Sequence, residues 1–140
     1  MALHWYDEYE DVTVEQVRAI IPGRDGGWWL EDIETCLTEY GVPYTREAVE
    51  REDMLAALDK GAILLVQFSE SNFDAEGHCF LIYGYKTAGA STLFLLHDPG
   101  VSPTPGVFGE PPGKALLLSA DYCMLVIQRF TNAYLYIQKD

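Results

Sequence analysis

The spacing of apolar residues changes near the middle of the chain, and this change limits the folds that the chain can adopt. Residues 28–40 carry an apolar stripe at helical spacing, formed by Leu30, Ile33, Leu37 and Tyr40. Later apolar residues come in short continuous runs, typical of buried strands, at 63–68, 78–85 and 91–98. Helices followed by antiparallel strands predict an α+β fold, with a helical first half packed on an antiparallel sheet from the second half.

Capping and turn residues predict the other elements. Thr13, followed three residues later by Gln16, has the pattern of a capping box, so a helix should begin at residue 14. Gly41 and Gly61 stand where helices over 28–40 and 51–60 should end. We also expect a short helix over 2–9, a helix from Ser119 to about Phe130 and a strand over 133–138. Five prolines and four glycines in residues 99–113 predict an irregular loop.

The charge of the chain excludes several classes of partner. The 140 residues, enough for one domain, include 9 basic and 22 acidic residues, a net charge of −13. Such a chain is a poor ligand for nucleic acid or for an anionic membrane surface, because both bind through Lys and Arg. Residues 1–70 carry −11 of the total. Two interpretations remain open: helices with solvated acidic faces, or a surface that attracts a cationic peptide or protein.

The cysteines and the first residues of the chain indicate the cellular compartment of the protein. Cys36, Cys79 and Cys123 are odd in number and widely spaced, which favours reduced thiols. The first residues lack the basic start and long apolar run of a signal peptide, and the apolar runs are too short to span a bilayer. The sequence therefore predicts a cytoplasmic protein. Without a CxxC motif or a zinc-finger spacing, we expect neither a cofactor nor a metal.

Two residues stand at strand ends where a catalytic pair could form. His78 opens one predicted strand and Asp98 ends the next. A carboxylate in that position would hold the imidazole in one tautomer and stabilise its cation. The alternative is two unrelated surface residues. A metal site that also includes His97 is disfavoured, because His97 and Asp98 are adjacent on a strand and diverge.

The segments LDKGAILLVQF from Leu58, GHCFLIYGY and LFLLHDPG together resemble the papain-like cysteine peptidases. They are most similar to the branch that processes bacteriocin leader peptides of the double-glycine type, with its uncharacterised relatives. The stretch from Val12 to Tyr44 fits as well, so the resemblance covers nearly all of residues 1–140 as a single peptidase-type domain. It implies a papain-like fold and hydrolysis of a peptide or amide bond. It makes His78 the general base and Asp98 its orienting partner.

The same resemblance predicts where the nucleophile should lie. In these families the reactive cysteine begins the first long helix and follows a glutamine that helps to form the oxyanion hole. Residues 1–6 match later turns of that helix, which places the expected cysteine about two turns upstream of Met1. The domain is then expected to lack the start of its nucleophile helix.

The cysteines inside the chain are poor substitutes for that nucleophile. Cys36 and Cys123 fall on apolar stripes, and Cys79 is adjacent to His78 on a strand, where neighbours point to opposite faces. The 140 residues are therefore predicted not to perform thiol acyl transfer. The alternatives are an inactive peptide-binding module derived from the fold, or a plain interaction protein. Trp28 and Trp29 would line a peptide groove or cap the core at a helix start.

Overall fold

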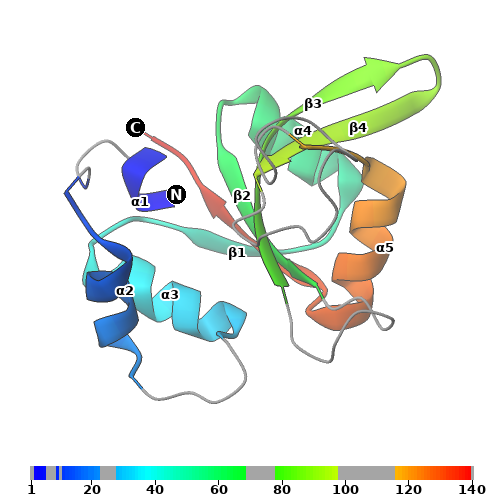
Figure 1. The fold of residues 1–140 in the computed structure, drawn as a ribbon. Helices are drawn as coiled ribbons and strands as arrows, with labels where there is room; N and C mark the ends of the chain where they lie inside the picture. Colours follow the sequence, from blue (N-terminus) through cyan, green and yellow to red (C-terminus); the bar gives the residue numbers. More distant parts are fainter. Residues whose placement is uncertain are drawn as a thin grey trace.

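The computed structural model describes residues 2–5, 9, 11–22, 28–68, 78–97 and 116–139 (Figure 1). Its elements follow in the order α1 (Ala2–Trp5), α2 (Val14–Ile20), α3 (Leu30–Glu39), β1 (Thr45–Ala48), α4 (Arg51–Asp59), β2 (Ile63–Phe68), β3 (His78–Ala88), β4 (Ser91–His97), β5 (Leu116–Ser119), α5 (Ala120–Phe130) and β6 (Ala133–Ile137). The chain thus has the predicted α+β class. Among the described residues, no helix has the length and apolar character needed to cross a membrane.

A six-stranded antiparallel sheet forms the centre of the fold. Its strand order is β1-β6-β2-β3-β4-β5. The last strand of the chain, β6, lies between β1 and β2 rather than at an edge. The sheet therefore pairs β1, which follows α3 in the chain, with the last strand of the chain.

Side chains alternate along β2 between two hydrophobic clusters, one on each face of the sheet. Leu64 and Val66 pack with residues of α4 and α5, whereas Ile63 and Leu65 pack with residues of α1 and α3. Figure 1 shows α3 and α5 well apart, separated by the central strands. A strand covered on both faces needs apolar residues throughout, which explains the continuous run in this part of the sequence.

Local sequence signals set the helix ends as predicted. The Thr13 hydroxyl accepts a hydrogen bond from the Gln16 N–H, and the Gln16 side chain accepts one from the Thr13 N–H, which completes the capping box of α2. Gly41 and Gly61 follow α3 and α4 with φ of 65° and 79°. Glycine adopts this left-handed conformation without a steric penalty, so both helices end there.

Three features differ from the sequence-based expectations. Strand β5 was not predicted, and β3 continues to Ala88, which leaves a tighter hairpin turn at Gly89 than expected. Asp32 lies off the apolar stripe of residues 28–40, and yet it is 4% exposed because its carboxylate caps the start of α3. In α2, Val17 packs against the cluster on the α3 side, whereas Val14 is exposed.

Candidate functional site

Antiparallel pairing brings the start of β3 and the end of β4 to one end of the sheet. His78 is the first residue of β3 and pairs with Phe68 of β2. His97 is the last residue of β4 and pairs with Leu81 of β3. The predicted start of a strand at His78 is thus confirmed, and β4 is described as far as His97, one residue before its predicted end. Asp98, the next residue after His97, and the predicted loop over 99–113 lie outside the described residues.

His97 takes part in an aromatic contact on the sheet. Its ring stacks on that of Tyr83, with centroids 4.5 Å apart and planes inclined by 17°. Tyr83 packs against the cluster on the α3 side of the sheet. Among the residues that the structure describes, no group of three or more His, Cys, Asp or Glu is placed to hold a metal ion.

Two of the three cysteines are core residues, as the sequence predicts. Cys36 and Cys123 are both buried, and burial raises the pKa of each thiol, that of Cys123 to about 12. The neighbouring carboxylate of Asp32 raises the pKa of Cys36 further. A nucleophilic cysteine needs a thiolate near neutral pH, so neither residue suits that role. Cys79 is half-buried, and all three thiols are free of disulfides.

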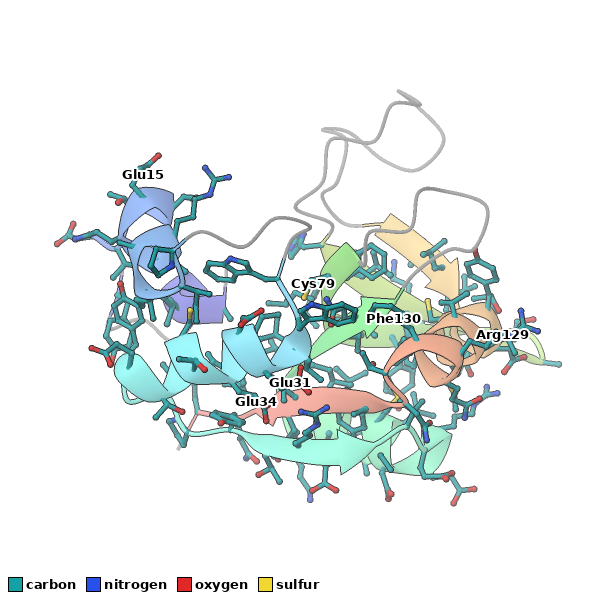
Figure 2. All side chains as sticks on the ribbon, turned by 90° about the horizontal axis from the view of Figure 1, so that it is seen from below. Glu15, Glu31, Glu34, Cys79, Arg129 and Phe130 are labelled. Carbon is teal, nitrogen blue, oxygen red and sulfur yellow. The ribbon has the colours of Figure 1, made fainter. Side chains whose placement is uncertain are left out.

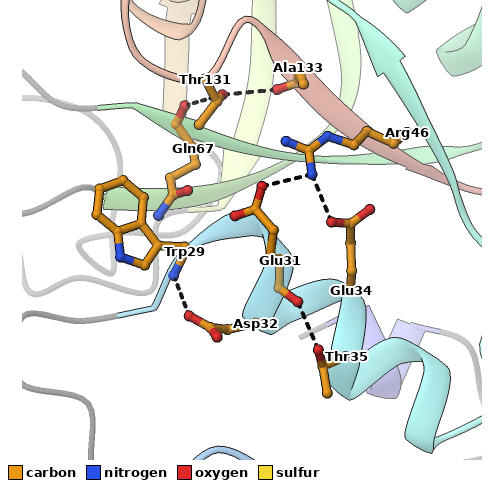
Figure 3. Close-up of polar contacts among 9 residues, drawn as sticks. All are labelled: Trp29, Glu31, Asp32, Glu34, Thr35, Arg46, Gln67, Thr131 and Ala133. Atoms are coloured by element: carbon orange, nitrogen blue, oxygen red, sulfur yellow. Dashed lines mark hydrogen bonds and ion pairs between the residues drawn. The ribbon is translucent and has the colours of Figure 1, made fainter.

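Gln67 is a buried polar residue on the central strand β2, directly opposite Cys79 of β3. Its side-chain Nε2 donates a hydrogen bond of 2.6 Å to the carbonyl oxygen of Trp28. Its backbone oxygen accepts one of 3.3 Å from the Thr131 hydroxyl, after α5 (Figure 3). The side-chain Oε1 has no hydrogen-bond partner among the described residues. A buried amide oxygen without a hydrogen-bond donor lowers the stability of the fold.

Trp29 stands immediately before α3, beside this glutamine (Figure 3). Its N–H donates a hydrogen bond of 2.8 Å to the Asp32 carboxylate, which fixes the start of the helix. Trp29 is 49% exposed, and its indole stacks on Phe130, the last residue of α5, with ring centroids 5.6 Å apart and planes inclined by 13°. Figure 2 shows Phe130 pointing from α5 toward the start of α3, while Arg129 points away. We call Trp29 and Phe130 the aromatic platform.

Four segments that are distant in the sequence therefore meet at one end of the sheet. They are the start of α3, the end of β2, the start of β3 and the end of α5. Sequence reasoning identified His78 and left two roles open for Trp29, but it missed Gln67 and Phe130. A glutamine inside the apolar run ILLVQF was the available signal for Gln67.

A separate open depression lies between α4 and β3. It is lined by Leu58, Asp59 and residues 84–87. The Tyr85 hydroxyl donates a hydrogen bond of 2.8 Å to Asp59, and this bond raises the pKa of Tyr85. His78 is seven residues from Tyr85 along β3, so this depression belongs to the other end of the strand.

Comparisons of the chain with models of known protein families, with curated proteins and with solved structures find no match.

Proposed function

We propose that this chain is a papain-like cysteine peptidase-type domain in which His78 is the general base and Asp98 orients its imidazole. The observation that supports the pair is the antiparallel pairing of β3 and β4. It brings His78, which begins β3, and His97, which precedes Asp98 in the chain, to the same end of the sheet. The α+β class and the helices on both faces of the sheet are compatible with such a fold.

The chemistry of the pair follows from its groups. His78 would take the proton of an attacking thiol and return it to the amine that leaves the peptide, and Asp98 would stabilise the imidazolium between these steps. The proposal assigns no nucleophile to Cys36 or Cys123, because burial raises the pKa of both thiols. The thiol would come from outside these 140 residues. Cytoplasmic residence belongs to the same proposal, supported by the three free thiols.

A catalytically inactive peptide-binding module is the second candidate. The aromatic platform favours it, because an exposed indole at a junction of elements is a common feature of binding surfaces. In this case His78 would stay as a structural hydrogen-bonding residue, and binding would need no thiol.

A thiol-labelling experiment tests the chemical part of the proposal. The 140-residue chain is treated with a thiol-directed electrophile, and the rates at its three cysteines are compared with those in His78→Ala and Cys79→Ser. We expect Cys79 to react at the rate of an ordinary accessible thiol, with no change in His78→Ala. One hyper-reactive cysteine that loses its reactivity in His78→Ala would overturn the placement of the nucleophile outside these residues and would exclude the inactive module, because the chain would then contain a thiol activated by His78.

A further inference from the structure

The aromatic platform has a fixed side and a side that faces solvent. The stack on Phe130 immobilises the indole of Trp29, and yet the residue stays 49% exposed. Large apolar side chains are rarely this exposed in the described part of this chain, where the others are Val14, Tyr122 and Leu125. An indole that is held in place and open to solvent has lost much of the freedom that ligand binding would otherwise remove.

An unpaired acceptor lies next to this ring. The Gln67 side chain is anchored through Nε2 to the carbonyl oxygen of Trp28, the residue before Trp29, and this bond holds Oε1 in place. Gln67 is 1% exposed, and its Oε1 is unpaired among the described residues. The negative end of a buried amide dipole acts through low-dielectric surroundings, where its field is stronger than in water.

The charges along α3 are negative, like the oxygen end of this amide dipole. Residues 28–40 include Glu31, Asp32, Glu34 and Glu39, and no Lys or Arg. Glu31 and Glu34 form ion pairs with Arg46 of β1 at 2.9 and 2.8 Å, which partly offsets them. Arg129, the residue before Phe130, points away from the platform (Figure 2). With the net charge of −13, the platform therefore lies in a field that attracts cations.

We propose that the aromatic platform binds an arginine side chain of a peptide, with the guanidinium lying on the indole of Trp29. This proposal rests on the proposed function in one respect, that the ligand is a peptide. A flat guanidinium stacks on an aromatic face and is attracted by its quadrupole, and tryptophan is the strongest partner for this contact. Arginine offers only donors and carries a positive charge, which suits a site whose surroundings hold a buried amide oxygen and carboxylates.

Two peptides of nearly the same shape but different charge test whether the positive charge contributes to binding. A short dye-labelled peptide that contains arginine is titrated with the 140-residue chain and followed by fluorescence anisotropy. The control peptide carries citrulline, a neutral analogue of nearly the same shape, at the same positions. We expect binding of the citrulline peptide to be weaker by about 3- to 10-fold, since the cation–π attraction is lost.

Variants then locate the contact. Trp29→Ala should weaken binding of the arginine peptide by about 3- to 10-fold, and Trp29→Phe by less. Tyr122→Ala is the matched control, because Tyr122 is an aromatic residue of α5 with 42% exposure. It should leave the affinity unchanged. Circular dichroism of each variant confirms that the chain is folded.

Three results would overturn the assignment: equal binding of both peptides, no binding of either, or equal losses in Trp29→Ala and Tyr122→Ala.

Failure of this assignment can be distinguished from failure of the proposed function. If that function fails, the His78 imidazole is indifferent to Asp98→Asn while the platform still selects arginine. If the platform fails, Trp29→Ala changes nothing while His78 still responds to Asp98.

Discussion

The Gln67 side chain donates a hydrogen bond of 2.6 Å to the carbonyl oxygen of Trp28 and so ties the central strand β2 to the start of α3. The bond crosses 39 residues of sequence. It holds Trp29 beside the end of the sheet at which His78 begins β3. A buried side chain in this position stabilises the fold and at the same time fixes the surroundings of the candidate site.

Gln67→Glu should destabilise the chain strongly. The change replaces the donor Nε2 by an oxygen that faces the Trp28 carbonyl, and it buries a carboxyl group at a position that is 1% exposed. We expect a loss of about 3 kcal/mol or more in the free energy of unfolding, measured by urea denaturation.

Gln67→Met is the matched control for that experiment. It removes the bond to Trp28 and also removes the unpaired Oε1, so the free energy of unfolding should fall by only about 1 kcal/mol. Equal losses in the two variants would mean that a carboxyl group at this position carries no extra cost, which would contradict the burial of Gln67.

A pair of leucines tests the position of the core. Leu135 of β6 is fully buried in the cluster on the α3 side, whereas Leu125 of α5 is 43% exposed. Leu135→Ala should lower the free energy of unfolding by about 2–5 kcal/mol, because it leaves a cavity. Leu125→Ala should change it by less than about 0.5 kcal/mol. Similar effects at both positions would contradict the burial of β6 between β1 and β2.

The three thiols should react in a fixed order. At neutral pH a thiol reagent should modify Cys79 first, because it is half-buried, while Cys36 and Cys123 are buried and have raised pKa values. All three should react at similar rates in denaturant. Mass spectrometry after timed labelling gives the order, and early modification of Cys123 would contradict its burial in the core.

Tyr134 should make the fold sensitive to alkali. Burial, with the nearby charges of Glu47 and Asp53, raises its pKa from 10.0 to about 12. Below pH 10 both the folded and the unfolded chain keep the phenol proton, so its contribution to stability is fully present. Between pH 10 and about 12 the unfolded chain loses the proton first, and stability falls as the pH rises.

Tyr134→Phe removes this titration. Its free energy of unfolding should therefore fall less steeply with pH above pH 10 than that of the original chain. Thermal unfolding at a series of alkaline pH values gives the two slopes. Identical slopes would mean that the folded chain does not protect this phenol.

Features that depend on neighbouring residues could be predicted from the sequence. The Thr13–Gln16 capping box and the glycine ends at Gly41 and Gly61 involve residues within one helical turn, so local chemistry decides them. The strand over 63–68 was recognisable because burial on both faces demands an apolar run, and the strand predicted over 91–98 was recognisable by its run of apolar residues.

Features that depend on pairing across the sequence could not be predicted in this way. The place of β6 between β1 and β2 is set by pairing with strands that lie far earlier in the sequence. Nothing local to Phe130 marks it as the partner of Trp29. Likewise, the sequence placed His78 at a strand end, but only the register shows which strands are its neighbours.

The tautomer of His78 tests the central claim most directly. Nitrogen-15 NMR of imidazole-labelled chain is recorded at a pH where His78 is neutral, for the original chain and for Asp98→Asn. If Asp98 orients His78, the original chain should show one tautomer with the proton on the ring nitrogen that faces the carboxylate, and Asp98→Asn should show a mixture. The same mixture of tautomers in both chains would contradict the assignment of His78 and Asp98 as a catalytic pair.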